Sequence, residues 1–151
     1  MEIHRLVFSP IDVNTYIIED NSGDCAIIDC GCYDDAEFKI FTSFIEEKKL
    51  NPVLLLNTHC HLDHIFGNNY LLRKYNIRAL SHEKEEKNRR KGPQHAVIFG
   101  LTMETPPEPE RFIADNEVIK FCSTEFKVLH VPGHSAGRSE EHTSELQSRQ
   151  S

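Results

Sequence analysis

The chain of 151 residues is long enough for one domain with a hydrophobic core. Its net charge of −7 argues against a protein that mainly binds nucleic acid, because phosphate binding requires a basic surface. No apolar run has the length of a membrane span, and the first residues do not lead into a signal-peptide core. We therefore expect neither a nucleic-acid nor a membrane partner, while the oligomeric state stays open.

The five cysteines are odd in number and irregularly spaced, which argues against a disulfide framework. Reduced thiols in a cytoplasmic protein are the simplest interpretation. Cys30-Gly31-Cys32 could suggest a metal site, but no second cysteine pair completes a four-thiolate set.

The first half of the chain predicts strands followed by a helix. Strands are expected at residues 3–8, 14–18 and 25–28, where apolar and β-branched residues are separated by turn-forming ones. Asp34 or Asp35 can cap a helix that runs to about Lys49, with apolar residues at three- and four-residue steps. Asn51-Pro52 would end this helix. The apolar run 53–56 then predicts a strand buried on both faces.

The second half predicts a helix at 67–75, a strand at 77–80, and strands at 118–121 and 126–131. The charged run 84–91 reads as a solvated helix face, with a contact to an anionic substrate as the alternative. Interspersed helices and strands place the chain in the α/β or α+β class, with at least one partly buried sheet.

The segment "NTHCHLDHIFGN" contains three histidines and an aspartate within six positions, directly after the apolar run 53–56. Residues two apart on an extended backbone point to the same side, so His59 and His61 can converge on one ion. Asp63 and His64 come one turn later and can face a neighbouring position. Imidazole and carboxylate are the ligands of catalytic zinc sites, whereas Cys60 should point into the core.

Two further residues are candidates for the same site. His134, in "HVPGHSAG", follows a strand and a turn as His59 does, and is the third ligand that one ion needs. His130 lies within that strand and is expected to pack there. Asp29 closes another apolar strand; its carboxylate could hydrogen-bond to a metal-bound imidazole or to the histidine loop. A capping role in a sharp turn is the alternative for Asp29. The remaining histidines are expected to be on the surface or locally hydrogen-bonded: His4, His82, His95 and His142.

Together, "AIIDCG", "THCHLDH" and "HVPGHSAG" resemble the metallo-β-lactamase superfamily of hydrolases. Within it the chain is most similar to glyoxalase II-like (hydroxyacylglutathione hydrolase-like) members, from Met1 to Gly137. The family pattern is usually IIDPG where this chain has Asp29-Cys30-Gly31. The resemblance implies an αββα sandwich with two metal ions at one edge, between two sheets. It implies His59, His61 and His134 on the first metal, and Asp63 with His64 on the second.

The resemblance also implies a bridging aspartate and one more histidine, further along the chain, on the second metal. The segment after Gly137 contains no aspartate, and His142 is its single histidine. We therefore expect residues 1–137 to be the N-terminal part of a metallo-β-lactamase-like domain. Residues 138–151, "RSEEHTSELQSRQS", are expected to be a non-native tail that derives from a sequencing adapter, or a disordered polar tail.

The resemblance implies metal-dependent hydrolysis by metal-bound hydroxide, with a thioester such as S-acyl glutathione as the first substrate to consider. Asp63 would be catalytic and would orient the nucleophile. Two zinc ions are expected in an intact parent protein, and iron or manganese would also suit this ligand set. The alternatives are a lactonase, a phosphodiesterase, or a non-catalytic metal-binding fragment. The chain of 151 residues itself is expected to be inactive.

Overall fold

The computed structural model describes residues 1–8, 12–130 and 139–142, with backbone alone for His130 and for 139–142. Six strands form sheet A in the order β1-β2-β3-β4-β5-β6, and three form sheet B in the order β7-β8-β9. Sheet A consists of β1 Glu2–Phe8, β2 Val13–Glu19, β3 Asp24–Ile28, β4 Asn51–Leu56, β5 Ala79–His82 and β6 Arg111–Ile113. Sheet B consists of β7 Val118–Phe121, β8 Thr124–His130 and β9 Ser139–His142.

The helices are short apart from the first. They are α1 Asp35–Glu47, α2 Leu62–Ile65, α3 Asn68–Tyr75, the 3₁₀ helix η1 Glu83–Glu85, α4 Glu86–Arg90 and α5 Gly92–Ile98. Asp34 is the N-cap of α1, as expected for one of the two candidates, and its carboxylate accepts from the Glu37 N–H at 2.9 Å.

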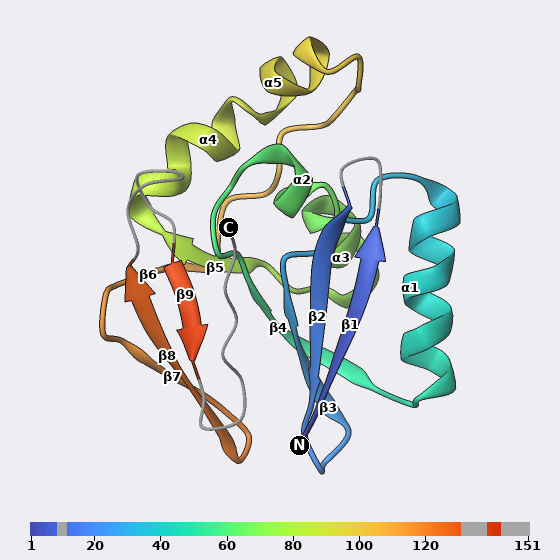
Figure 1. The fold of residues 1–151 in the computed structure, drawn as a ribbon, viewed down its shortest axis with the longest axis vertical. Helices are drawn as coiled ribbons and strands as arrows, with labels where there is room; N and C mark the ends of the chain where they lie inside the picture. The colour runs from blue at the N-terminus through green and yellow to red at the C-terminus, as the bar shows by residue number, and fades with distance from the viewer. Residues whose placement is uncertain (9–11, 131–138, 143–151) are drawn as a thin grey trace.

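Alternating side chains of sheet A divide the core into two layers. On one face, Ile27 and Leu55 pack with Phe41 of α1 and Leu71 of α3. On the other face, Ile28 and Leu56 pack with a second cluster that includes Phe126 of sheet B. Figure 1 shows α1 on one side of sheet A and β7–β9 on the other. This arrangement confirms the α/β class and a partial αββα sandwich, since the described residues place no helix on the outer face of sheet B.

The parallel part of sheet A determines where a site can form. β3, β4, β5 and β6 pair in parallel, so their carboxyl ends lie at one edge of the sheet. Ligand sites in such sheets lie outside the carboxyl ends of the strands. Asp29 follows β3, the histidine loop follows β4, and η1 follows β5. These three segments therefore meet at the same edge.

Three details differ from the sequence expectations. Asn51 and Pro52 begin β4, and Val53 is 42% exposed, so the first half of β4 is not buried on both faces. The charged run is not wholly solvated, because Glu85 and Arg89 are buried. β6 was not expected, because its three residues are too few to show a strand pattern.

The structure describes four residues of the segment that was expected to be a non-native or disordered tail. Its residues Ser139–His142 form β9, which pairs antiparallel with β8. Ladder hydrogen bonds require only backbone groups, so a polar sequence can take this place. The division of the chain at Gly137 stays a prediction.

Candidate metal centre

The histidine loop connects β4 to α2 at the carboxyl edge of sheet A. Its first residue, Asn57, donates its backbone N–H to the Leu80 carbonyl at 3.0 Å, which extends the pairing with β5. His61 has an extended backbone and is the N-cap position of α2, so His59 and His61 precede the helix. Asp63 and His64 are in the helix itself.

The three imidazoles of the loop cluster together. The His59 and His61 ring centroids lie 4.9 Å apart with perpendicular planes, and those of His59 and His64 lie 4.0 Å apart. Asp63 Oδ2 lies 3.5 Å from His64 Nε2. Burial of His59 and His64 lowers the local dielectric and strengthens the interaction of these groups with a cation.

Asp29 lies behind this cluster and is completely buried. Its carboxylate accepts from the Thr58 backbone N–H at 2.8 Å and from the Thr58 hydroxyl, and lies 2.9 Å from His64 Nδ1. These are the partners that a buried carboxylate requires. The structure thus gives Asp29 contacts to both the histidine loop and an imidazole. Helix α1 is capped by Asp34 instead.

The backbone at Asp29 has a φ of 57°, in the left-handed region that aspartate tolerates better than most residues. Thr15 of β2 stabilises this turn: its hydroxyl donates to the Asp29 carbonyl at 2.7 Å and accepts from the Gly31 N–H at 3.0 Å. The turn directs the carboxylate back toward the loop after β4.

Sequence reasoning missed a second buried carboxylate, Glu85, which accepts from the Cys60 N–H at 2.7 Å. Arg89, four residues later, is also buried and donates to both Glu86 carboxylate oxygens and to the Pro106 carbonyl. A spacing of four places Glu85 and Arg89 on one helix face. In a run composed almost wholly of charged residues, however, the pattern does not show which face is buried.

The donor set fits a divalent cation, because imidazoles and a carboxylate gather here. The resemblance assigns His59 and His61 to one ion and Asp63 and His64 to the other, and this assignment stays a prediction, since the His59 ring lies nearer to His64 than to His61. His134, the third ligand expected for the first ion, lies outside the described residues. In the described part of the chain, the one group of three whose ligand atoms all lie within 4.8 Å of one another is Glu2, His4 and Glu19.

That second group lies on the β1–β2 ladder, away from the histidine loop in sequence. His4 Nε2 is 3.1 Å from Glu19 Oε2 and 3.5 Å from Glu2 Oε2. Glu2 and Glu19 are opposite each other in the register, so the histidine relieves a like-charge cross-strand pair. His4 is therefore locally hydrogen-bonded, as expected.

Two buried thiols near the site, Cys60 and Cys32, are poor ligands as they stand. Burial raises the pKa of the Cys60 thiol well above its usual range, and the Glu85 carboxylate raises it further. Burial likewise raises the pKa of Cys32, beside Cys30. Neutral thiols are weak metal ligands, so the packing role expected for Cys60 agrees with this environment.

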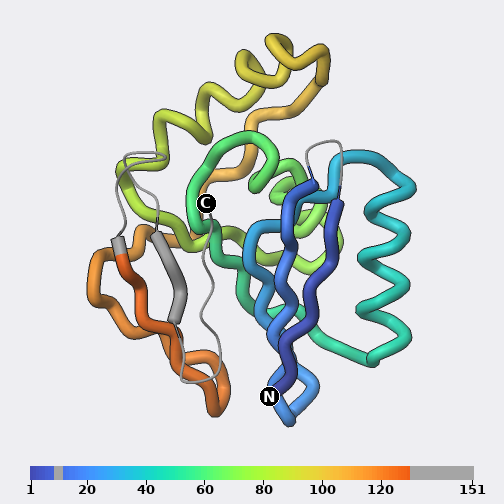
Figure 2. The backbone as a smooth tube through the Cα atoms, viewed as in Figure 1, coloured from blue at the N-terminus to red at the C-terminus, as the bar shows by residue number. Residues whose placement is uncertain are grey.

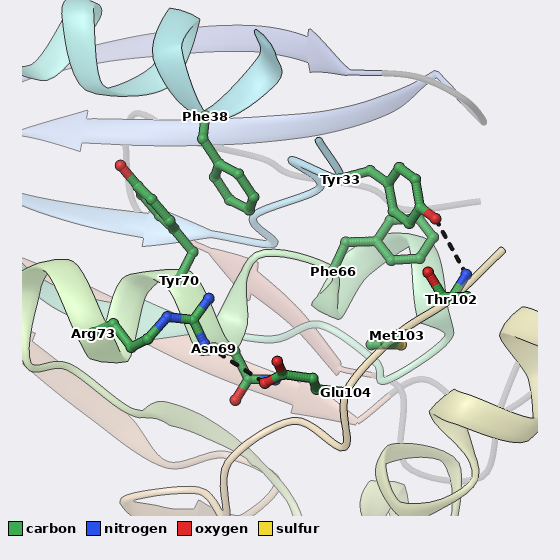
Figure 3. A pocket seen from close by; sticks show the side chains of 9 residues that line it. All are labelled: Tyr33, Phe38, Phe66, Asn69, Tyr70, Arg73, Thr102, Met103 and Glu104. Atoms are coloured by element: carbon green, nitrogen blue, oxygen red, sulfur yellow. Dashed lines mark hydrogen bonds and ion pairs between the residues drawn. The ribbon is translucent and has the colours of Figure 1, made fainter. Parts of the chain in front are cut away.

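A cavity of about 150 Å³ opens beside α3, between α1 and the segment after α5 (Figure 3). Phe38 and Tyr70 stack on one side with ring centroids 4.0 Å apart, and the Thr102 N–H donates to the Tyr33 hydroxyl on the other. Of the predicted metal ligands, the four that the structure describes, His59, His61, Asp63 and His64, do not line this cavity. It is therefore distinct from the histidine cluster.

Comparison with known protein families decides the identity of this arrangement. The model of the metallo-beta-lactamase superfamily matches residues 9–143. The chain belongs to the metallo-β-lactamase superfamily. The match covers the turn at Asp29, the whole histidine loop and the segment that contains His134, so the resemblance seen in these motifs is confirmed.

Within the superfamily, the chain is similar in sequence to hydroxyacylglutathione hydrolases and is therefore glyoxalase II-like. The chain is 32% identical over 139 residues to the hydroxyacylglutathione hydrolase GloC of Haemophilus influenzae, covering 91% of this chain and 64% of that protein. It is 27% identical over 126 residues to a hydroxyacylglutathione hydrolase of Pelagibacter ubique, covering 83% of this chain and 44% of that protein. The chain thus spans about two thirds or less of the length of these relatives.

Solved structures of the superfamily have the same fold. The di-iron-bound form of TTHA1623 superposes with a TM-score of 0.79 at 27% identity, covering 94% of this chain and 67% of that one. The B3 metallo-β-lactamase BLEG-1 superposes with a TM-score of 0.82 at 22% identity, covering 95% and 68%. The second likeness shows the fold alone. Within the described ranges, no helix of this superfamily member is both long and apolar enough to cross a bilayer.

Proposed function

We propose that this metallo-β-lactamase superfamily member provides the histidine-loop half of a zinc-dependent hydrolase that cleaves a thioester such as S-acyl glutathione. The carrying observation is the cluster of His59, His61 and His64, held from behind by the buried Asp29. The names of the sequence relatives support the thioester. A cytoplasmic location and a small-molecule partner stay part of this proposal.

His59 and His61 would bind the first ion together with His134, and Asp63 with His64 would bind the second. When bound, such ions make water nucleophilic near neutral pH and polarise the substrate carbonyl. The protein orients the groups around them. Asp29 lies against His64 Nδ1, so His64 presents Nε2 on the side where Asp63 lies. Thr58 Oγ1 is 3.2 Å from His59 Nδ1 and restrains that ring similarly.

Asp63 is the residue that we propose to be catalytic. Its side chain is 22% exposed, whereas His64 beside it is 9% exposed. A carboxylate at the rim of a buried imidazole cluster can accept a hydrogen bond from the attacking water and direct that water toward a carbonyl carbon. Zinc is the first metal to test, although TTHA1623 is a di-iron protein in its solved form.

The second candidate function is a non-catalytic metal-binding fragment. It is favoured by the geometry described above, because in the described part of the chain no three donor atoms of the histidine loop all lie within 4.8 Å of one another. The sequence after Gly137 offers no aspartate to bridge the ions. We therefore propose that the chain of 151 residues is inactive by itself.

The metal content of the purified chain separates these candidates. About one zinc ion per chain supports the metal-binding fragment, and two ions support a complete metal centre. If neither this chain nor the longer product of the source gene binds zinc, the proposed metal site is overturned. His59→Ala should abolish the bound ion. His95→Ala, which changes a histidine outside the loop, should leave it in place.

The hydrolase proposal is tested on the product of the source gene, resequenced and expressed through the Gly137 codon. It should hydrolyse S-lactoylglutathione, and activity should fall at least about 1000-fold in Asp63→Ala. A longer product that holds metal and leaves this thioester untouched would overturn the substrate. Metal-dependent turnover by the 151-residue chain would overturn its proposed inactivity.

A further inference from the structure

The backbone of the histidine loop is buried, so each of its N–H groups needs an acceptor. Asn57 donates to the Leu80 carbonyl, and Thr58 donates to Asp29 Oδ1. Cys60 donates to Glu85 Oε1 at 2.7 Å, a short hydrogen bond with a carboxylate acceptor. Two buried carboxylates, from the ends of β3 and β5, therefore hold the loop from two sides.

Glu85 is fully buried, which is costly for a carboxylate unless hydrogen bonds compensate. Besides the Cys60 N–H, the Asn88 side-chain amide lies 3.4 Å from the same oxygen. Arg89 is buried next to it but gives its nitrogens to Glu86 and Pro106. The short hydrogen bond from the Cys60 N–H therefore helps to compensate the burial of this carboxylate.

Glu85 Oε1 accepts from the residue between the two predicted ligands His59 and His61. Cys60 separates His59 from His61, so its peptide N–H lies between the two Cα atoms that carry these imidazoles. The perpendicular rings, 4.9 Å apart, depend on the φ and ψ angles around this residue. Contacts of α2 with α4 and α5 bring the segment after β5 to this end of sheet A, as Figure 2 also shows.

We propose that Glu85 is a positioning residue that fixes the His59–Cys60–His61 backbone so that both imidazoles can bind one divalent ion. This inference rests on the proposed function and assigns a role within it to the one carboxylate of the charged run that is fully buried. Glu85 touches neither substrate nor ion in this role. It acts through the Cys60 peptide.

The test compares three variants of the full chain with wild type. Glu85→Leu removes the acceptor, Glu85→Gln keeps an acceptor oxygen, and Glu83→Gln changes an exposed neighbour in the same short helix. The first readout is Co²⁺ binding: its affinity is measured by competition with a chelator, and its absorption spectrum is recorded. The second readout is NMR of the metal-free protein, which follows the Cys60 amide and the His59 and His61 rings.

Glu85→Leu should weaken Co²⁺ binding about 10-fold or more, alter the spectrum, and shift both ring signals in the metal-free protein. Glu85→Gln should remain within about 3-fold of wild type, and Glu83→Gln should be unchanged. Wild-type affinity, spectrum and ring signals in Glu85→Leu would overturn the inference. If Glu85→Leu does not fold, Glu85→Asp takes its place, since its shorter side chain keeps the charge but cannot reach the amide.

The two readouts also separate this inference from the proposed function. A wild-type chain that binds no Co²⁺ overturns the metal centre. In that case, unchanged His59 and His61 ring signals in Glu85→Leu also overturn the proposal that Glu85 positions these residues. Shifted ring signals support this role of Glu85. A wild-type chain that binds Co²⁺ with the same affinity as Glu85→Leu overturns positioning alone.

Discussion

Asp29 Oδ2 lies 2.9 Å from His64 Nδ1, across 35 residues of sequence. The carboxylate follows strand β3 and the imidazole lies in helix α2, so this contact joins two parallel crossover units at the carboxyl edge of sheet A (Figure 1). The same carboxylate holds the Thr58 N–H. The buried Asp29 side chain thereby holds the backbone of the histidine loop and orients the predicted ligand His64.

Asp29→Asn should destabilise the protein and weaken its metal binding. The amide oxygen can still accept from the Thr58 N–H. The NH₂ group cannot replace the carboxylate oxygen that faces the Thr58 hydroxyl and His64 Nδ1, so these buried groups lose their acceptor. The expected cost is about 1–3 kcal/mol of unfolding free energy, measured by urea denaturation of the metal-free chain. Asp12→Asn is the matched control, because Asp12 also has a positive φ but is exposed. Equal stabilities of the two variants would contradict the role of Asp29.

Gly67→Ala should be destabilising because there is no room for a Cβ atom. The new methyl group would lie 2.4 Å from Cys30 Sγ and 3.0 Å from the Cys30 carbonyl oxygen. Overpacking of this kind costs about 1–3 kcal/mol. Combining it with Cys30→Ala removes the sulfur and should recover part of the loss, so the two changes are non-additive in a double-mutant cycle. Additive free energies would mean that the sulfur is not the obstacle.

The folded protein should lose stability in acid because of the hydrogen bonds that Asp20 accepts. The Ser123 hydroxyl, donating at 2.6 Å, and the Ser22 N–H, at 2.9 Å, hold the pKa of the Asp20 carboxyl well below its usual value of 3.8. Because the folded protein holds the carboxylate ionised more strongly than the unfolded chain does, this stabilisation is present above pH 3.8. It is lost as the pH falls below that value toward the folded pKa.

Melting temperatures of wild type and Asp20→Asn, measured from pH 7 down to pH 2.5, check this dependence. The difference between the two should be largest near neutral pH and should shrink below about pH 4. Ser123→Ala should reproduce part of the effect, since it removes the strongest donor. A difference that is constant over the whole range would contradict the coupling of Asp20 ionisation to folding.

Thiol reactivity should be confined at first to Cys122, which is exposed in the turn between β7 and β8, whereas the other four cysteines are buried. Burial, with the nearby Asp24 and Glu19 carboxylates, raises the pKa of Cys25 to about 12. Few thiolates form there at neutral pH. An aromatic disulfide reagent should therefore show one fast equivalent that is absent in Cys122→Ser. A second fast equivalent in that variant would show that a buried thiol is accessible.

The sequence predicted much of this fold because its signals are local. The cap at Asp34, the apolar alternation of the strands and the turn residues each act within a few positions along the chain. The predicted ranges of α1, β7 and β8 agree with the structure to within a few residues. β6 was missed because three residues are too few for a strand pattern, and Val53 of β4 is exposed although the run 53–56 is apolar.

The histidine loop was recognisable from sequence because its donor atoms are concentrated in six positions of one segment, and the family match supports the motif. Its surroundings depended on the tertiary structure. Asp29 meets His64 and Glu85 meets Cys60 because three parallel strands end at one edge. Sequence periodicity reports which faces are apolar, but it cannot report which charged residue of a run faces another segment. Glu85 accepts from the Cys60 N–H because the segment after β5 lies beside the histidine loop, and only packing in three dimensions decides that.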